Sequence, residues 1–251
     1  MKIVVLGGTG LIGRQLVARL QKLGHEVLPA SPSSGVNAVT GAGLDTALRG
    51  ADVVVDVTNS PSFEDKAVRE FFEVGTKNLL AAETAAGVRH HVALSIVGAE
   101  RLPDSGYMRA KIAQEGLIRS SKVPFTILRA TQFFEFLAAI GESGLDGDTI
   151  RLTSAPLQPI ASEDVVAALA DIAVAPPVNG TVEVAGPEAL PLATLVQTVF
   201  DANGDARPIV VDDEARYYGA KLGAQTLIPI PGTGPAARIG AVRLERWLQK
   251  S

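Results

Sequence analysis

Cysteine is absent from this chain of 251 residues, and histidine occurs only three times, at positions 25, 90 and 91. The absence of cysteine excludes disulfide bonds, thiolate catalysis and zinc sites built on cysteine, and it fits a reducing compartment. The histidines lie beside predicted strands without the spacing of metal ligands. We therefore expect them to be structural or exposed, and we predict no metal site.

Clusters of basic residues are also missing, and the net charge is -4 at neutral pH. This balance excludes the electrostatic footprint of a nucleic-acid-binding protein. No apolar run is long enough for a membrane span, and the short run at the N-terminus does not have the form of a signal peptide. The sequence predicts a cytoplasmic protein with a small-molecule substrate and neither a nucleic-acid nor a membrane partner.

The hydrophobic content of 47% is that of a globular chain, and its length allows one large core or a core with a small lobe. Over the first 130 residues, apolar strands alternate with helical patterns, which indicates a parallel sheet covered on both faces. The predicted strands are 2–6, 26–30, 53–57, 91–95 and 124–128, and the predicted helices are 11–23, 44–48, 66–86 and 108–120.

Beyond residue 130 the alternation fades, and proline and glycine become frequent. Helices are predicted over 162–175, 192–203 and 241–249, a short strand over 181–184, and a loop over 219–234. We predict a Rossmann-type doubly wound α/β domain over residues 1–130. Residues 131–251 are expected to form a smaller substrate-binding lobe, interleaved with the first part as one compact unit.

A glycine-rich turn follows the first apolar strand and leads directly into a helix, with the sequence Gly7-Gly8-Thr9-Gly10-Leu11-Ile12-Gly13. Strand, glycine turn and helix form the context in which such glycines bind a dinucleotide. We expect Gly7 to permit the tight turn, Gly10 to let a pyrophosphate approach the backbone, and Gly13 to let helix and strand come close. The helix N-terminus would then face the phosphates.

A Tyr-x-x-x-Lys motif occurs at Tyr107 and Lys111. On a helix these positions lie on one face, so the phenol and the ammonium are expected to be neighbours. A cation near a phenol favours the phenolate and brings a tyrosine closer to useful acid–base chemistry at neutral pH. Ser95 ends the preceding strand, and its hydroxyl is a candidate for binding a substrate carbonyl oxygen.

Taken together, these motifs resemble the extended and atypical short-chain dehydrogenases/reductases, and the chain is most similar to NmrA-like NAD(P)-binding proteins. The segments that carry the resemblance are 5–13, 50–56, 75–82, 92–95, 107–111, 124–129 and 158–166. They cover the first 130 residues in order, and part of the remainder. The gap of twelve positions between Ser95 and Tyr107 is shorter than extended members usually show.

The resemblance implies a nicotinamide-dependent oxidoreductase that transfers a hydride to a carbonyl-like substrate. It implies that Tyr107 is the general acid, that Lys111 is its partner and holds the ribose, and that Ser95 is a third catalytic residue. The cofactor-binding residues that it implies, together with those expected from the loops, are Gly7, Thr9, Gly10, Leu11, Ile12, Gly13, Ser31, Ser33, Ser34, Thr58, Asn59 and Lys111.

The loop after the second strand bears on the choice of nicotinamide. A carboxylate at this place would hold the ribose 2′-hydroxyl of NAD, but the loop reads Ser31-Pro32-Ser33-Ser34 and contains no acid. The serine hydroxyls could receive a 2′-phosphate, and Arg14 could supply the positive charge that the loop lacks. We therefore expect NADP rather than NAD.

Two other functions fit the same sequence. Some NmrA-like proteins have lost activity and only sense the cofactor, so a non-catalytic NADP(H)-sensing regulator is the main alternative. A non-redox module that binds a sugar nucleotide is a third. The sequence names no substrate and leaves open whether the chain is a monomer or a homodimer.

Overall fold

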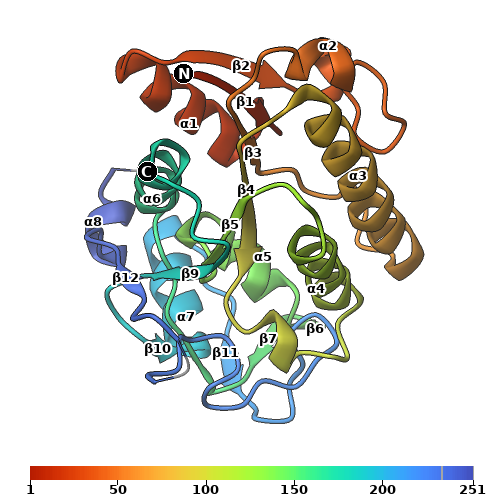
Figure 1. Ribbon diagram of the computed structural model, residues 1–251. Coiled ribbons are helices and arrows are strands. Elements are labelled where there is room, and N and C mark those ends of the chain that lie inside the picture. The colour runs from red at the N-terminus through yellow and green to blue at the C-terminus, as the bar shows by residue number, and fades with distance from the viewer. Residues whose placement is uncertain (233, 251) are drawn as a thin grey trace. The chain divides into compact units, whose positions relative to one another are not determined.

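The computed structural model describes residues 1–232 and 234–250 (Figure 1). The first part of the chain alternates strands and helices, as predicted. Its elements are β1 (Lys2–Leu6), α1 (Leu11–Lys22), β2 (Glu26–Ala30), the 3-10 turn η1 (Pro32–Ser34), α2 (Leu44–Leu48), β3 (Val53–Asp56), α3 (Asp65–Ala86), β4 (His90–Ile96), η2 (Ala99–Arg101), α4 (Gly106–Arg119) and β5 (Phe125–Ala130).

The remaining elements are shorter on average. They are η3 (Phe134–Phe136), α5 (Leu137–Glu142), β6 (Leu145–Asp146), β7 (Thr149–Leu152), β8 (Pro156–Leu157), α6 (Ser162–Val174), β9 (Gly180–Ala185), β10 (Leu190–Pro191), α7 (Leu192–Asn203), β11 (Ile209–Val211), β12 (Arg238–Ile239) and α8 (Leu244–Leu248).

A seven-stranded sheet, mostly parallel, organises the fold, with the strand order β12-β9-β5-β4-β3-β1-β2. β1 lies between β2 and β3, and it pairs in parallel with both. The chain runs from β1 to β2 on one side and then returns past β1 to β3 on the other side, so the strand order reverses between β1 and β3. In open α/β sheets, ligands bind beyond the carboxyl ends of the strands at such a reversal. The fold is the predicted Rossmann type.

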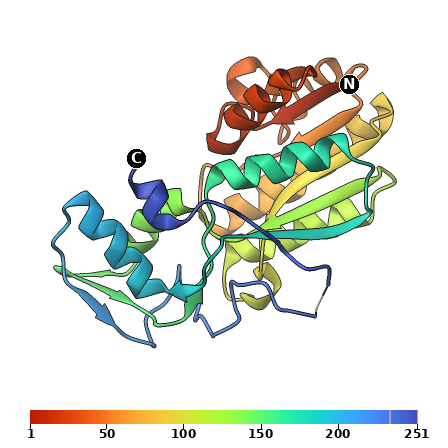
Figure 2. The same cartoon turned by 90° about the vertical axis from the view of Figure 1, so that its left-hand side faces the viewer.

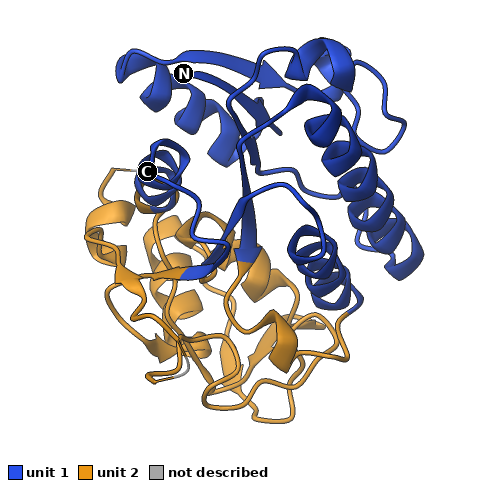
Figure 3. Cartoon of the chain, viewed as in Figure 1, with its two compact units in different colours: residues 1–95, 106–129, 165–182 blue, residues 96–105, 130–164, 183–251 orange. Residues whose placement is uncertain are grey.

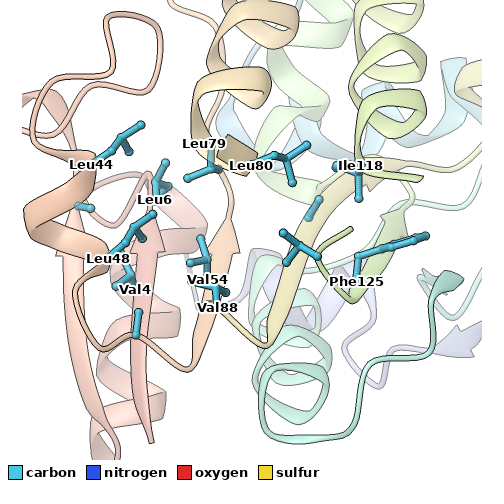
Figure 4. Packing of buried hydrophobic residues seen from close by; sticks show 14 of the residues in the cluster. Val4, Leu6, Leu44, Leu48, Val54, Leu79, Leu80, Val88, Ile118 and Phe125 are labelled. Atoms are coloured by element: carbon cyan, nitrogen blue, oxygen red, sulfur yellow. The ribbon is translucent and has the colours of Figure 1, made fainter. Parts of the chain in front are cut away.

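Helices cover both faces of this sheet. α1 and α6 lie on one face, and α2, α3 and α4 lie on the other, as two views agree (Figures 1 and 2). The contacts between the helices and the sheet are apolar, because each helix turns one hydrophobic side towards the strands. In α3, for example, Val68, Phe72 and Leu79 recur at helical spacing and are buried. A cluster that joins α2, α3 and α4 to the strands forms one part of the core (Figure 4).

Contacts between residues divide the chain into two compact units (Figure 3). Unit 1 comprises residues 1–95, 106–129 and 165–182, and unit 2 comprises residues 96–105, 130–164 and 183–251. Unit 2 contains a three-stranded sheet of order β11-β7-β6 and the two-stranded pair β10-β8. The boundary predicted at residue 130 stays a prediction. Among the described residues, no helix is both long enough and apolar enough to cross a membrane.

The predicted and observed elements differ mainly near the C-terminus. The final helix was predicted over 241–249 but is limited to Leu244–Leu248. The small strands of unit 2 were not predicted, because strands of two to four residues are too short to show a hydrophobic alternation. The loop predicted at 219–234 includes Thr233, which lies outside the described residues.

Two of the three histidines are buried in unit 1, in agreement with a structural role. Nδ1 of His91 lies 2.8 Å from Oε1 of Glu83, and both side chains are fully buried. Burial alone would lower the pKa of His91, but the charge and hydrogen bond of Glu83 raise it overall. In the described part of the chain, no group of histidine and acidic residues has the arrangement of a metal site.

Candidate functional site

The glycine turn joins β1 to α1 as the sequence predicts. Gly7 has a φ of +76°, which glycine adopts without strain, and its amide donates to the carbonyl of Ala30 at the end of β2 (2.9 Å). The amide of Gly10 then donates to the carbonyl of Gly7 (2.9 Å), and α1 begins at the next residue. The turn thus brings the N-terminus of α1 to the carboxyl ends of β1 and β2.

Three of the four glycines are required by close backbone approach. A Cβ at Gly13 would lie 2.1 Å from the carbonyl oxygen of Gly7, and one at Gly8 would lie 2.7 Å from Cβ of Pro29. A Cβ at Gly7 would lie 2.9 Å from the carbonyl oxygen of Val57. Gly10 differs, because a Cβ there would meet only the Gly7 carbonyl oxygen at 3.3 Å.

Gly10 is exposed and has an ordinary φ of -77°, so the fold itself gives little reason for glycine there. It is the N-cap of α1, yet no side chain caps this helix end and its first turn holds no acidic residue. The positive end of the helix dipole is therefore not compensated by the cap residue or the first turn. A bare backbone at Gly10 with free helix amides fits the pyrophosphate of a dinucleotide, with Thr9 exposed beside it and Leu11 and Ile12 in the first turn.

The serine loop that follows β2 forms the short turn η1, and its hydroxyls bind to groups within the loop. Oγ of Ser31 lies 2.8 Å from Oγ of Ser33. Oγ of Ser34 accepts from the amide of Ser31 and donates to the carbonyl of Ser31, both at 2.9 Å. Ser31 is buried, whereas Ser33, Ser34 and Arg14 are exposed. Ser33 is thus the most available hydroxyl of the loop.

Polar residues follow β3 at the point where the strand order reverses. Oδ1 of Asp56 accepts from the amide of Thr58 (2.9 Å) and from its hydroxyl (2.6 Å). Asn59 comes next, and its Oδ1 accepts from the hydroxyl of Tyr107 (2.7 Å). A Cβ at Gly7 would lie only 3.1 Å from Cα of Thr58. The segment that holds Tyr107 is therefore adjacent to the glycine turn.

Tyr107 lies in the first turn of α4, in an aromatic setting. Its ring centroid is 5.8 Å from that of Phe63 and 5.8 Å from that of Phe72. Burial raises the pKa of Tyr107 to about 12, because a phenolate is poorly stabilised away from water. The phenol is therefore fully protonated at neutral pH.

Lys111 lies one helical turn after Tyr107 and is only 3% exposed. Its Nζ donates to the carbonyl of Leu94 (2.9 Å) and to Oε1 of Gln114, and it lies 4.4 Å from the centroid of the Phe72 ring. Burial lowers the pKa of Lys111 to about 8, and the negative charges of Asp56 and Glu115 partly oppose this effect. Tyr107 and Lys111 share Phe72 as a neighbour but have different hydrogen-bond partners.

Ser95 is buried at the end of β4, and its hydroxyl donates to Oε1 of Glu115 (2.7 Å). Two arginines also bind Glu115: Arg129 through two hydrogen bonds of 2.8 Å, and Arg119 at 3.3 Å. Burial alone would raise the pKa of Glu115, but Arg129, Ser95 and Arg119 lower it overall. The structure therefore joins Ser95 to an ionic cluster, while Tyr107 is joined to Asn59.

The sequence interpretation missed two residues of this site. The sequence analysis assigned no role to Asp56 or to Gln114. Nε2 of Gln114 donates to Oδ2 of Asp56 (3.0 Å), which connects Lys111 to β3. A signal for Gln114 was available, because it lies three residues after Lys111 and seven after Tyr107, on the same face of one helix.

Comparisons with known proteins agree with this geometry. A sequence profile that describes NAD(P)H-binding proteins matches residues 7–176. The chain is 35% identical over 144 residues to a (4-alkanoyl-5-oxo-2,5-dihydrofuran-3-yl)methyl phosphate reductase of Streptomyces griseus, which covers 52% of this chain and 48% of that protein. It is 28% identical over 151 residues to the photosystem II assembly factor Ycf39 of Synechocystis, with coverages of 55% and 46%. The chain thus spans about half the length of these relatives.

Solved structures show the same fold. A short-chain dehydrogenase/reductase superfamily protein from Agrobacterium tumefaciens with bound NAD aligns with a TM-score of 0.74 and 22% identity, over 100% of this chain and 95% of that one. UDP-glucuronic acid 4-epimerase from Bacillus cereus aligns with a TM-score of 0.75 and 16% identity, over 99% and 97%. The chain belongs to the NAD(P)H-binding family, and it has the fold of these short-chain dehydrogenase/reductase and epimerase structures.

Proposed function

We propose that this protein is an NADPH-dependent reductase of a small carbonyl-like compound, with Tyr107 as the general acid. One observation carries the proposal. The hydroxyl of Tyr107 is bound by Asn59, and the neighbouring Thr58 is close to Gly7 of the glycine turn. A phenol that could donate a proton thus lies near the edge of the sheet where we expect a dinucleotide, which supports the proposal. The reductases among the relatives support the same reaction class.

Different residues of unit 1 would bind the cofactor and donate the proton. When bound, a reduced nicotinamide supplies a hydride. The turn at Gly7 and Gly10, with the amides of Leu11 and Ile12, would hold the pyrophosphate, and Thr58 and Asn59 would face a ribose. Tyr107 would turn its hydroxyl from Asn59 and donate the proton to the substrate oxygen as negative charge develops there. Its pKa of about 12 keeps the phenol protonated at neutral pH, which is the form that a proton donor needs.

Lys111 would bind a ribose hydroxyl and offset the negative charge on Tyr107 after proton transfer. Its ammonium has three donor hydrogens, of which two are directed at Leu94 and Gln114. The third hydrogen would serve a ribose hydroxyl, provided that the ammonium, which is buried against the ring of Phe72, becomes accessible to the cofactor. A binding titration of NADPH, NADP+, NADH and NAD+, followed by a screen of carbonyl compounds with the preferred reduced form, tests the proposal. Failure of all four to bind would remove it.

Replacement of Ser33 by aspartate is expected to shift the proposed preference for NADPH towards NADH. Ser33 is exposed in the loop after β2, where a 2′-phosphate would lie. A carboxylate there would repel the phosphate and offer an acceptor to a free 2′-hydroxyl. We expect the ratio of NADH to NADPH affinity to rise at least about 10-fold, equivalent to roughly 1.4 kcal/mol.

The matched control for this change is Ser33→Asn, which has a similar shape and no charge. It should shift the ratio much less than Ser33→Asp. Equal affinity of wild type and Ser33→Asp for NADPH would show that the phosphate does not bind at this loop.

Ser95 was expected to be the third catalytic residue, but its hydroxyl donates to Glu115, and it would have to leave that carboxylate to reach a substrate. In Ser95→Ala, a buried hydrogen bond to a charged group is lost, so we expect the free energy of unfolding to fall by roughly 1.5–3 kcal/mol. We expect kcat to fall by less than about 10-fold, because Glu115 already occupies the hydroxyl. Urea unfolding and steady-state kinetics measure both effects. A kcat lower by about 100-fold would instead assign Ser95 a direct contact with the substrate.

A cofactor-sensing protein remains the second candidate. The similarity to photosystem II assembly factors favours it, because the name of those relatives states assembly rather than catalysis. Such a protein would bind NADPH and show no turnover with any carbonyl compound, and Tyr107→Phe would leave all its properties unchanged.

Binding of a sugar nucleotide in preference to NADPH would support the third function, the non-redox module.

A further inference from the structure

A line of buried polar groups connects α4 to the segment after β3. Nζ of Lys111 donates to Oε1 of Gln114, Nε2 of Gln114 donates to Oδ2 of Asp56 (3.0 Å), and Oδ1 of Asp56 binds Thr58. The exposed fractions of Lys111, Gln114 and Asp56 are 3%, 2% and 5%. Three polar side chains this deeply buried are rare unless they satisfy one another.

The amide of Gln114 has only one orientation that suits both of its neighbours. Its carbonyl oxygen must face the ammonium, which only donates, and its NH2 group must face the carboxylate, which only accepts. Gln114 therefore connects a buried cation to a buried anion through two charge-assisted hydrogen bonds. Without this bridge, the ammonium would keep only the carbonyl of Leu94 and the ring of Phe72 as close partners.

Both ends of this line lie in the proposed active site. At one end, Asp56 holds the amide and hydroxyl of Thr58, and the next residue, Asn59, binds the hydroxyl of Tyr107. At the other end, Lys111 lies one turn after Tyr107 on the same helix. The two candidate catalytic groups and the segment expected to face the ribose thus form one closed circuit of covalent and hydrogen bonds.

We propose that Asp56 and Gln114 are positioning residues that fix the Lys111 ammonium and the Thr58–Asn59 segment as one unit. This inference rests on the function proposed above, and it assigns roles to two residues beyond the Ser-Tyr-Lys set. Gln114 acts on the reaction through Lys111, and Asp56 acts through Gln114 and Thr58.

The pKa of Lys111 depends on its hydrogen bond with Gln114, so it can be used to test this arrangement. The titratable groups around it are Asp56 on β3, Glu115 and Tyr107 on α4, and His91 on β4 with its partner Glu83 on α3. Only Asp56 is connected to Lys111 through Gln114. Removal of the bridge in Gln114→Leu should lower the pKa of Lys111 below about 8, and an added carboxylate in Gln114→Glu should raise it. Shifts of opposite sign would show that Gln114 controls the surroundings of the ammonium, and the pH dependence of NADPH binding then separates a positioning role from a merely structural one.

The test is an NMR titration of the lysine Cε resonances in the full chain, with the Lys111 signal identified by its loss in Lys111→Met. We expect the proton affinity of Lys111 to change at least about 10-fold, downward in Gln114→Leu and upward in Gln114→Glu. The control is Asn78→Leu, which removes a different amide, one that donates to Ala38 and Val39 at 2.9 Å. Its Lys111 should titrate as in wild type.

Binding of NADPH is measured on the same samples as a function of pH. We expect the affinity to fall as Lys111 loses its proton, with a midpoint that moves with each variant. If wild type binds NADPH but Lys111 titrates alike in all variants, the positioning role is wrong and the proposed function stands. If Lys111 shifts as expected but neither NADPH nor NADH binds, the proposed function is wrong. Should Gln114→Leu not fold, the sign of the shift in Gln114→Glu decides.

Discussion

Replacement of Tyr107 by phenylalanine is expected to lower kcat for carbonyl reduction by about 100- to 10,000-fold, the range that general acid catalysis contributes. The ring contacts with Phe63 and Phe72 can persist in the variant, because only the hydroxyl is removed. Asn59 loses its donor, but it is exposed and water can replace the phenol. We therefore expect the affinity for NADPH to stay within about 3-fold of wild type.

A loss of kcat with an unchanged affinity for NADPH would assign Tyr107 to the chemical step and not to the binding of the cofactor. Tyr218→Phe is the matched control, because Tyr218 is a half-exposed tyrosine of unit 2 whose hydroxyl makes only a long contact of 3.4 Å with the carbonyl of Ala139. It should retain kcat. Steady-state kinetics and a fluorescence titration of NADPH measure both quantities. Turnover that survives in Tyr107→Phe would exclude the phenol as the proton donor and would favour another acid.

How much of this site the sequence predicts depends on whether a feature is local. The glycine turn was predicted in full, because a short apolar strand, three spaced glycines and a helical pattern follow one another within 20 residues. Tyr107 and Lys111 were also placed correctly on one helix by their spacing. Their partners were not, because Asn59 and Tyr107 are separated by 48 positions and meet only through the packing of α4 beside β3.

The same reasoning explains why the hydrogen-bond partner of Ser95 and the small sheets of unit 2 were not predicted. The sequence places Ser95 at the end of a strand, but whether its hydroxyl reaches Tyr107 or Glu115 depends on the rotation of α4, which spacing alone does not give. In unit 2, strands such as β6 and β8 contain two residues each, so they offer no periodic pattern. The parts that could not be predicted are those set by tertiary contacts.

Replacement of Gly13 by alanine is expected to lower the stability of the fold. Replacement of Gly10 by alanine is expected to lower the affinity for NADPH and to leave the stability nearly unchanged. In Gly13→Ala, the new methyl group would lie 2.1 Å from the carbonyl oxygen of Gly7 and 2.7 Å from Cα of Gly8. Both neighbours are backbone atoms and cannot turn away as a side chain would. We expect a loss of about 3 kcal/mol in the free energy of unfolding from overpacking, reduced by roughly 1 kcal/mol because alanine favours a helix.

Gly10→Ala should leave the fold almost unchanged. The new methyl group would meet only the Gly7 carbonyl oxygen at 3.3 Å, and the φ of -77° suits alanine. Alanine is a poorer N-cap than glycine, but it also reduces the entropy of the unfolded chain, so we expect a net change within about 1 kcal/mol. The methyl group would nevertheless stand where the pyrophosphate approaches the backbone, and the affinity for NADPH should fall at least about 10-fold.

Urea unfolding and NADPH titration of both variants show whether each glycine is needed for the stability of the fold or for the binding of the cofactor. Gly13→Ala should unfold at lower urea than wild type whether or not a nucleotide is present. Gly10→Ala should unfold nearly as wild type does without nucleotide, but saturating NADPH should stabilise it less by about 1.4 kcal/mol for each 10-fold loss of affinity, because ligand stabilisation grows with the logarithm of the affinity. If Gly10→Ala binds NADPH as tightly as wild type, the phosphates do not lie against this turn, and the placement of the cofactor at α1 is wrong.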